Sequence, residues 1–350
     1  MTETIRTEVG WRRRRRLEFL GGVGLLLGFA TLVALSVGSV RVPLAELLAA
    51  VAGGGSELNR NIVWRNRLPR VLGAIVAGGG LAVAGAAMQT VLRNPLGAPY
   101  TLGISQAAAF GAALSIIVTG VGADGASGGL VARSLTPIAA FFAGMVSTGV
   151  ILALVTYRRA TPETMILTGV ALGSMFQAGF TLLQYVASDT ELAAIVYWTF
   201  GDVGRVGWSQ VLVMTTTVCA ATAYFVWHGW DYDVLDAGTA TAKSLGINVE
   251  SLRIRGMAVA SLVTALIVSF VGIIGFVGLV APHIVRLVIG GTERYLLPAS
   301  AIVGATLLVV ADTAARTVLS PVVLPVGILT SFLGAPLFLY LVIEGRQYWQ

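Results

Sequence analysis

Runs of apolar residues long enough to cross a lipid bilayer recur along almost the whole chain. A transmembrane helix needs about 20 predominantly apolar residues, and the bilayer interior leaves backbone groups no partner outside the helix itself. Hydrophobic residues make up 56% and charged residues 11% of the 350 residues, whereas a soluble domain has about 25% charged residues. The sequence therefore predicts an all-α, polytopic membrane protein.

About ten segments qualify as membrane spans by length and hydropathy. They are residues 17–38, 69–92, 102–121, 135–157, 165–187, 208–230, 256–275, 276–290, 296–315 and 324–344. An even number of spans returns the chain to its starting side, so both termini are predicted to be cytoplasmic. The basic run Arg12–Arg16 before the first span resembles an export signal, but the near-spanning length of that segment favours an uncleaved helix.

The distribution of basic residues supports this orientation. With the N-terminus inside, 15 of the 23 Lys and Arg residues lie at cytoplasmic ends and 8 at external ends, as the positive-inside rule requires. Residues 1–16 then form a cytoplasmic basic tail, and residues 17–350 form one transmembrane domain. Because the arginines occupy short loops and not one basic face, nucleic acid is not an expected partner. Cys219 stands alone in an apolar run and is predicted to be a buried structural thiol.

One polar stretch, residues 231–255, interrupts the apolar chain and contains Lys243, the only lysine. Charge-free runs flank it on both sides, so it lies outside the bilayer, on the cytoplasmic side in the orientation above. Its composition favours a short helix, for which Asp236, Thr239 and Thr241 offer capping oxygens. An ordered amphiphilic helix at this place offers a binding surface to a partner. It indicates a protein whose energy is supplied by a separate subunit.

Glycine and proline interrupt several of the predicted spans. Gly256–Val285 is too long for one straight helix and carries Gly272, Gly275, Gly278 and Pro282, so it is divided into the spans 256–275 and 276–290, with a further break expected at Pro282. Residues 94–103 hold two prolines and two glycines, and the last span contains Gly334–Pro336. Interrupted backbone at membrane depth is tolerated only where it is buried in protein or lines a cavity. These interruptions therefore indicate a translocation path. Residues 188–207 are expected to form a short helix at the outer interface.

Three stretches together resemble one known family. They are RLPRVLGAIVAGGGLAVAGAAMQTVLRNPLGAPYTLG (67–103), AKSLGIN followed by GIIGFVGLVAPHIVRL (242–287), and LLPASAIVGATLLVVADTAAR with LPVGILTSFLGAPLFLYLV (296–342). They are similar to the permease subunits of ABC importers for iron-siderophores, haem and cobalamin (the FecCD-type family), in the family's order. The resemblance implies a multi-pass protein of the cell (inner) membrane. It favours an iron-siderophore complex as cargo because that cargo is the commonest among relatives, with haem or cobalamin as the alternative.

The same resemblance implies the partners of the chain. They are a second permease subunit (the same or a related chain), two ATP-binding subunits, an extracytoplasmic substrate-binding protein, and membrane lipid. A phosphate-binding loop needs Gly-x4-Gly-Lys-Ser/Thr, whereas Lys243 is preceded by alanine at both required glycine positions, 237 and 242. The chain is therefore expected to be a permease and not an enzyme. No cofactor or metal is expected on it, and ATP and Mg are used by the partner ATPase.

By resemblance, Asp236–Gly246 forms the coupling helix that inserts into the ATPase. The expected contacts are Asp236, Thr239, Ala240, Lys243, Ser244, Leu245 and Gly246, and the alternative is an ordinary solvated loop. The family also closes its cytoplasmic mouth in a region that Thr161, Pro162, Glu163 and Thr164 match.

Arginines at predicted outer ends form a second set. Family permeases use basic residues at matching places to receive acidic residues of the binding protein, which implies docking by Arg67, Arg70 and Arg316, with less support for Arg60 and Arg65. A guanidinium group suits this role because it holds a carboxylate in two hydrogen bonds. The alternative is an interfacial anchor. Asp312 lies four residues before Arg316, so the two are predicted to pair on one helix face.

Two other function classes fit the sequence less well. A secondary carrier driven by an ion gradient needs ionisable residues deep in the membrane, and Asp312 is the single plausible candidate. A membrane-embedded lipid enzyme usually gathers several carboxylates or histidines, and no two acidic residues stand at helical spacing within one predicted span. The permease of an ATP-driven importer is the prediction.

Overall fold

The computed structural model describes residues 2–38, 42–120, 130–158 and 161–344, and within these ranges every regular element is helical. The α-helices are α1 (Thr2–Ser36), α2 (Leu44–Val51), α3 (Glu57–Asn61), α4 (Leu68–Val91), α5 (Ile104–Thr119), α6 (Leu130–Arg158), α7 (Pro162–Val186), α8 (Asp189–Thr199), α9 (Trp208–Trp227), α10 (Gly229–Ala237), α11 (Thr239–Ser244), α12 (Val249–Val271), α13 (Val277–Ile289), α14 (Glu293–Thr317) and α15 (Val326–Glu344). A π-helical segment, η1 (Ile62–Arg67), and two 3-10 turns, η2 (Pro99–Leu102) and η3 (Val203–Arg205), complete the order. The all-α prediction is confirmed.

Seven of the described helical segments are long and apolar enough to cross a membrane. They are Arg13–Ser36, Glu57–Val91, Ser134–Tyr157, Pro162–Val186, Trp208–Trp227, Val249–Val271 and Glu293–Thr317. Shorter apolar helices occupy Ile104–Thr119, Val277–Ile289 and Val326–Tyr340. Each of these segments overlaps one of the predicted spans, so the length and hydropathy of the apolar runs located the helices correctly. α1 runs without interruption from Thr2 into the first span, so the predicted tail, residues 1–16, is helical from Thr2 onward, and its cytoplasmic position stays a prediction.

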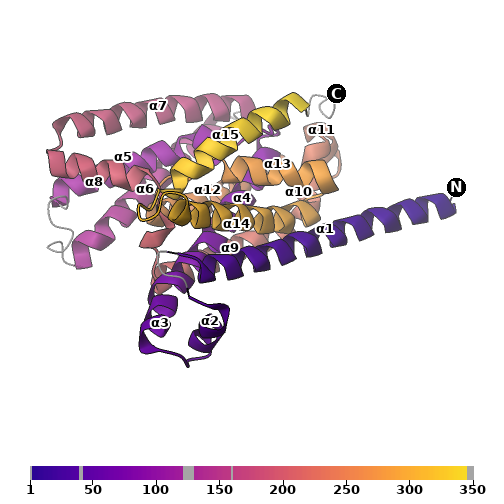
Figure 1. The fold of residues 1–350 in the computed structure, drawn as a ribbon. Helices are drawn as coiled ribbons and strands as arrows, with labels where there is room; N and C mark the ends of the chain where they lie inside the picture. Colours follow the sequence, from indigo (N-terminus) through magenta and orange to yellow (C-terminus); the bar gives the residue numbers. More distant parts are fainter. Residues whose placement is uncertain (1, 39–41, 121–129, 159–160, 345–350) are drawn as a thin grey trace.

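Different helices lie at the two ends of the bundle (Figure 1). The N-terminal end of α1, the C-terminal end of α15 and the short helices α10 and α11 lie at one end, termed the inner end after the predicted orientation. The opposite, outer end carries α8 and a small lobe of α2 and α3 that stands apart from the bundle. The predicted short helix within residues 188–207 is therefore confirmed as α8, which the Ser188 hydroxyl and the Glu191 carboxylate cap reciprocally.

Helix α4 is the centre of the bundle and packs against α9, α12, α13 and α14. Glycines allow the backbone of α4 to approach the backbones of its neighbours closely, as is common between membrane helices. A Cβ on Gly85 would lie 1.7 Å from the Gly278 carbonyl oxygen of α13, and a Cβ on Gly78 would lie 2.3 Å from the Gly304 carbonyl oxygen of α14. No side chain fits at either place, so glycine here fixes the distances between α4, α13 and α14.

The long charge-free run breaks between Val271 and Val277, where the predicted spans 256–275 and 276–290 meet, whereas the expected break at Pro282 is wrong. Gly272 has φ 78° and Phe276 has φ 65°, and both values end regular helix. Pro282 lies inside α13, and Pro336 likewise lies inside α15, so the expected interruption of the last span at Gly334–Pro336 is wrong. Gly334 serves packing instead, because a Cβ there would lie 2.4 Å from that of Phe276.

Candidate functional site

The predicted coupling helix is two short helices joined at Gly238. α10 ends at Ala237, α11 begins at Thr239, and Gly238 between them has φ 142° and ψ 143°, a backbone conformation that only glycine adopts readily. Gly238 is also the N-cap of α11, and no side chain caps that helix. The prediction of capping oxygens from Asp236, Thr239 and Thr241 is therefore wrong, since Asp236 belongs to the last turn of α10 and the two threonines lie within α11.

The predicted contact residues share one exposed surface at the inner end. Ala242 alone among the residues of α11 is buried, while most of the predicted contacts are exposed and Thr239 is half-buried. The exposed contacts are Asp236, Ala240, Lys243, Ser244, Leu245 and Gly246. Leu245 is 59% exposed just beyond α11, so an apolar side chain projects from an otherwise polar tip. This surface is called the coupling segment below, and comprises residues 229–246.

Three contacts attach the coupling segment to the bundle. The Arg253 guanidinium of α12 donates to the Thr239 hydroxyl (3.1 Å), and the Tyr232 hydroxyl donates to the Leu252 carbonyl (3.3 Å). The Asp233 carboxylate accepts from the backbone N–H of Glu293 at the start of α14 (2.7 Å). Burial raises the pKa of the Asp233 carboxyl above its ordinary value, and the hydrogen bond from Glu293 opposes that rise. The segment is thus held by α10, while its tip remains free for a partner.

The predicted mouth residues form the start of α7. Thr161 is the N-cap and accepts from the Thr164 N–H, Pro162 occupies the first turn, and Glu163 and Thr164 are exposed. Beside the coupling segment, Val155 of α6 and Thr239, Lys243 and Arg253 border a cavity of about 280 Å³. These placements put the start of α7 and the coupling segment at the same end of the molecule.

At the outer end, Asp312 binds two of the predicted docking arginines. The Arg70 guanidinium donates to the Asp312 carboxylate at 2.8 and 3.0 Å, and the Arg316 Nε donates to it at 3.1 Å. The predicted pairing of Asp312 with Arg316 is confirmed. Arg70 also reaches Asp202, before η3, at 3.3 Å. Sequence reasoning missed Arg70 and Asp202 as members of this cluster, because nothing local relates residues so far apart in the chain.

Arg67 and Arg316 also donate hydrogen bonds to the end of α1. Arg316 donates to the carbonyls of Ala34 and Val37 (both 3.2 Å), and the buried Arg67 donates to those of Leu35 and Ser36. The last carbonyls of a helix have no partner within the helix and carry partial negative charge, which cations stabilise. Arg67, Arg70 and Arg316 therefore all point into the chain, and their docking role stays a prediction.

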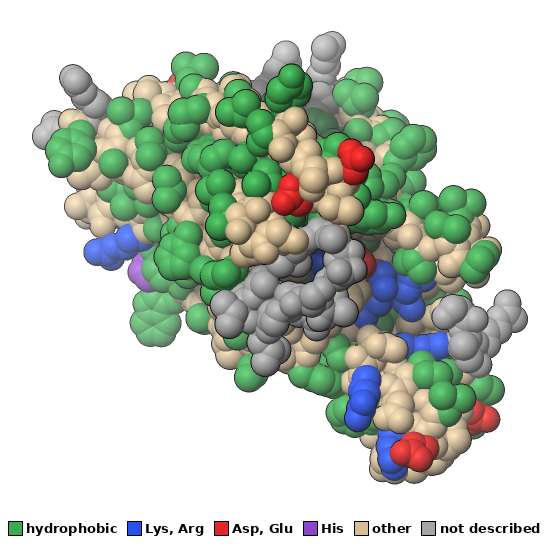
Figure 2. Space-filling view, turned by 90° about the vertical axis from the view of Figure 1, so that its left-hand side faces the viewer, with side chains coloured by type: hydrophobic (Ala, Val, Ile, Leu, Met, Phe, Trp, Pro, Cys, Tyr) green, Lys and Arg blue, Asp and Glu red, His purple; other side chains and the backbone are tan. Residues whose placement is uncertain are grey.

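Exposed arginines at the outer end lie on and beside the lobe. Arg60 ends α3 and Arg65 lies in η1, and both side chains are exposed. Figure 2 looks onto the outer end and shows Lys and Arg side chains on and next to the lobe, while hydrophobic side chains dominate the rest of this face. Trp64 ties the lobe to the bundle, because its indole N–H donates to the Ala50 carbonyl (3.0 Å) and its own carbonyl accepts from the Trp208 indole (2.9 Å).

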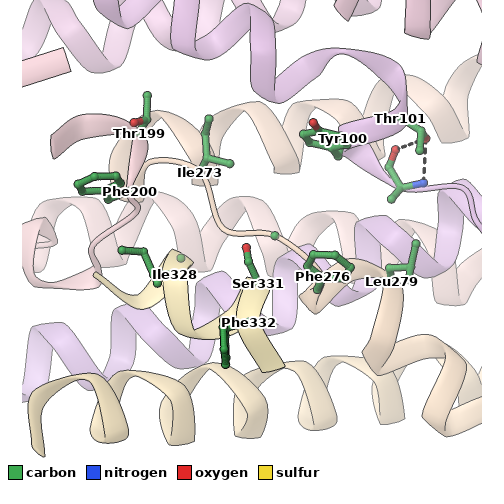
Figure 3. Close-up of a pocket in the computed structure, with 13 residues that line it drawn as sticks. Tyr100, Thr101, Thr199, Phe200, Ile273, Phe276, Leu279, Ile328, Ser331 and Phe332 are labelled. Carbon is green, nitrogen blue, oxygen red and sulfur yellow. Dashed lines mark hydrogen bonds between the residues drawn. The ribbon is translucent and has the colours of Figure 1, made fainter. Parts of the chain in front are cut away.

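A cavity of about 760 Å³ lies where the interrupted backbone segments meet (Figure 3). Its lining comes from the loop before α5, the end of α8, the break between α12 and α13, and the first turns of α15. The lining residues are Ala98, Tyr100, Thr101, Thr199, Phe200, Ile273, Gly275, Phe276, Leu279, Gly327, Ile328, Ser331 and Phe332. The lining is aromatic and aliphatic with a few hydroxyl groups, and none of these residues is Asp, Glu, His, Lys or Arg. The sequence signal for it was the clustering of glycine and proline in three of these segments.

One face of α7 presents polar side chains away from the chain's own core. Ser174, Gln177 and Thr181 are exposed and follow the i, i+3, i+7 spacing of a single helix face. α7 is apolar enough to span the membrane, yet it is largely uncovered by the rest of the chain. The Ser174 and Thr181 hydroxyls donate to the Val170 and Gln177 carbonyls of the same helix, so the Gln177 amide is the group of this stripe that most favours protein or water beside it.

Cys219 also differs from its prediction. It is exposed on α9 and lines an open apolar groove of about 480 Å³ between α9, α1, α4 and α14. The lone thiol is therefore not part of the core.

Comparison with known proteins gives a consistent result. The FecCD transport family matches residues 26–344. An ABC transporter permease protein of Methanocaldococcus jannaschii is 49% identical over 331 residues, 93% of this chain and 95% of that protein. The hemin transport system permease HmuU of Yersinia pestis is 34% identical, covering 92% and 96%, and the vitamin B12 import system permease BtuC of Vibrio cholerae is 36% identical, covering 89% and 92%. A solved ABC transporter of metal-chelate type, in an inward-facing conformation, has a TM-score of 0.81 and 29% identity, covering 93% of this chain and 99% of that one.

Proposed function

The chain belongs to the FecCD transport family of ABC importer permeases, and from this premise we propose that it carries a metal-chelate cargo, an iron-siderophore complex, across the cell membrane. Two ATP-binding subunits supply the energy, a second permease completes the path, and a substrate-binding protein delivers the cargo. Hydrolysis of ATP with Mg belongs to the partner subunits. This chain contributes the path and the surfaces on which the partners act.

The observation that carries the proposal is the exposed coupling segment. Its tip offers Ala240, Lys243, Ser244 and the projecting Leu245 to a partner, while α10 is anchored to α14 and α12. An exposed apolar side chain among small residues suits insertion into a groove of another protein. Force applied at the tip reaches the bundle through the anchored helix. The start of α7, at Thr161–Thr164, closes the inner mouth beside it.

The path runs between this chain and the second permease. The Gln177 amide in the polar stripe of α7 favours water or protein opposite it, and a cavity lies between α8, α13 and α15. A lining without acidic or basic side chains does not hold a charged cargo tightly, and a transport path must release what it binds. Selection of the cargo is then the task of the binding protein.

The binding protein docks at the outer end. Arg60 and Arg65 present exposed guanidinium groups to its carboxylates, whereas Arg67, Arg70 and Arg316 are more buried, and Asp202 and Asp312 offset part of their charge. Arginine suits carboxylate recognition because its planar group donates two parallel hydrogen bonds.

Transport by the reconstituted complex tests the proposal. The chain is placed in liposomes with its ATP-binding subunits and binding protein, ion gradients are collapsed with ionophores, and accumulation of a ferric siderophore is measured with and without ATP. We expect accumulation that depends on ATP and on the binding protein. Accumulation by the chain alone, driven by a gradient, would identify a secondary carrier and refute the proposal. Asp312 argues against that carrier because it is already paired with Arg70 and Arg316.

Haem or cobalamin is the alternative cargo. Two relatives bear the names of hemin and vitamin B12 transport proteins. The same liposomes therefore receive haemin and cyanocobalamin in parallel, and preference for either one replaces the siderophore assignment without affecting the importer assignment.

A further inference from the structure

A buried polar cluster joins four helices between the coupling segment and the cavity. Its members are Gln89 and Thr90 in the last turn of α4, Asp233 in α10, Arg286 in α13 and Glu293, the first residue of α14. Thr90 is 1% exposed, and Gln89 and Glu293 are each 2% exposed. Polar groups buried to this degree destabilise a fold unless they are paired in a specific arrangement. The pairing in this cluster runs from the coupling segment to α13.

The first connection is a helix cap supplied from a different helix. Thr292 is the N-cap residue of α14, but its side chain makes no capping hydrogen bond to the first turn. The Asp233 carboxylate of α10 instead accepts from the Glu293 N–H at 2.7 Å. The first amides of a helix have no partner within the helix, and an anion placed there is favourable. Displacement of α10 therefore either carries the start of α14 with it or breaks this bond.

The second connection passes through one hydroxyl group. The Thr90 hydroxyl donates to the Glu293 carboxylate and accepts from the Arg286 guanidinium (3.2 Å). Arg286 also donates to the Gln89 side-chain oxygen (2.8 Å), and the Gln89 amide reaches the Leu279 carbonyl (3.5 Å). Thr90 thus lies between the Glu293 carboxyl group of α14 and the Arg286 guanidinium group of α13.

α13 is suited to transmit displacement over its length. Its 13 residues correspond to about 20 Å at 1.5 Å per residue. Phe276, which precedes it, and Leu279, in its first turn, line the cavity, whereas Arg286 lies in its last turn. The close contact between Gly85 and Gly278 holds the cavity end of α13 against α4. A shift imposed at Arg286 therefore acts on a short helix whose other end borders the proposed path.

We propose that this cluster is the joint through which movement of the coupling segment reaches α13 and the cavity, with Thr90 as its central positioning residue. The proposal rests on the proposed function, because it assumes that a partner moves the coupling segment. Its physical basis is the short range of hydrogen bonds, which transmit a displacement only while their partners stay in contact. Replacing the hydroxyl by a methyl group of similar size separates Glu293 from Arg286 without opening a large cavity.

The test compares Thr90→Val, which removes the hydroxyl, with Thr90→Ser, which keeps it. In a Cys219→Ser background, Ser331→Cys places a thiol in the cavity lining, and the complex with its ATP-binding subunits is embedded in lipid nanodiscs. The measurement is the rate of thiol modification by a charged methanethiosulfonate reagent, with and without a non-hydrolysable ATP analogue. We expect the ratio of the two rates to differ from one in the parent and in Thr90→Ser, and to fall to one in Thr90→Val. Copurification of the ATP-binding subunits and the unfolding midpoint are measured for each variant.

The possible outcomes separate this proposal from the proposed function. If the parent responds to nucleotide and Thr90→Val responds equally, the joint is refuted while the importer assignment stands. If the parent neither retains ATP-binding subunits nor responds, the proposed function fails and the joint fails with it. Should Thr90→Val not fold, Asp233→Ala removes the interhelix cap at a half-buried position, and the same loss of response is expected. A full response of Asp233→Ala would refute the joint.

Discussion

At the scale of single residues, Leu245 provides the sharpest test of the coupling segment. Leu245→Asp places a charge where an apolar side chain is expected to enter a groove of the ATPase, so binding and coupling should both be lost. Its exposure of 59% means that folding should not suffer. Copurification of the ATP-binding subunits measures the effect.

The control for Leu245→Asp is Leu58→Asp. Leu58 is 69% exposed on the outer lobe, so the same change is made at a comparable exposed leucine on the opposite side of the molecule. Leu58→Asp should retain the ATP-binding subunits. Equal retention by both variants would remove Leu245 from the interface.

The outer arginines divide into two groups with opposite expected phenotypes. Charge reversal of the exposed Arg60 and Arg65 should weaken capture of the loaded binding protein, and the effect should shrink as salt rises because exposed charges are screened. Arg67→Glu instead buries a carboxylate against the carbonyls at the end of α1. Leaving buried polar groups mispaired in this way should lower the free energy of unfolding by about 3–5 kcal/mol.

Surface-plasmon titration of the binding protein and thermal unfolding together check this division. Arg60 and Arg65 variants with normal stability and salt-dependent loss of affinity support it. The opposite result would be an Arg67→Glu variant that is stable but does not bind the binding protein, while the Arg60 and Arg65 variants still bind it. That result would assign docking to the buried Arg67.

Residue-level prediction succeeded where partners are close in sequence. The pairing of Asp312 with Arg316 follows from a spacing of four on one helix, and needs no knowledge of the fold. The bonds from Arg70 to Asp312 and from Arg67 to α1 depend on how α1, α4 and α14 pack. Because the sequence does not reveal that packing, arginines at the ends of the spans were predicted to carry unpaired charge at the surface.

At the scale of elements, the contact between α4 and α13 is expected to be intolerant of any side chain. Gly85→Ala would place a Cβ 1.7 Å from the Gly278 carbonyl oxygen, so the two helices must separate. Overpacking of this kind costs about 1–3 kcal/mol. The midpoint of thermal unfolding in detergent should fall accordingly.

Gly28→Ala is the matched control for that experiment. Gly28 is also a glycine inside a membrane helix, α1, but a Cβ there meets no atom within 4 Å. Its stability should equal or slightly exceed that of the parent, because alanine favours helix more than glycine does. An equal loss in both variants would show that the close contact does not limit the packing of α4 and α13.

Helix positions were predictable because hydropathy depends on the chain's own residues, whereas helix ends and breaks depend on neighbours. The spans agree with the helices to within a few residues at most ends. Pro336 does not break α15, and Gly238, not an oxygen-bearing side chain, starts α11. Proline is tolerated in membrane helices where the freed groups find other partners, and no sequence rule identifies those partners.

At the scale of the whole molecule, the polar stripe of α7 predicts water beside it. In a Cys219→Ser background, Gln177→Cys should react rapidly with a charged, membrane-impermeant thiol reagent. The native Cys219, in its apolar groove on the membrane-spanning helix α9, should react at least about tenfold more slowly, because a charged reagent does not enter an apolar environment. Mass spectrometry of the modified protein measures both rates. Equal rates at the two positions would contradict a water-filled path along α7.

Resemblance named the partners, and the coupling segment was located from the sequence because it is one continuous polar stretch. The polar stripe of α7 and the cavity between α8, α13 and α15 combine residues whose arrangement depends on packing, and as parts of a path they imply a second chain opposite them. The sequence of one chain gives the residues on one side of such a path only, because the other side is formed by the second chain.

The lobe of α2 and α3 has a consequence for how this permease can diversify. It stands apart from the bundle, and its contacts include Trp64, whose ring packs 5.8 Å from that of Trp208 and whose polar groups bond to Ala50 and Trp208, and the buried Leu47 and Ala50, which belong to the same core as Ala34 and Leu35 at the end of α1. A lobe at the edge of the bundle can be exchanged with little repacking of the helices around α4, provided that its contacts to α1 and η1 are kept. Grafting residues 42–66 from one relative onto another should therefore transfer the choice of delivery protein while leaving the cargo route intact, so recognition and conduction can evolve independently in one polypeptide.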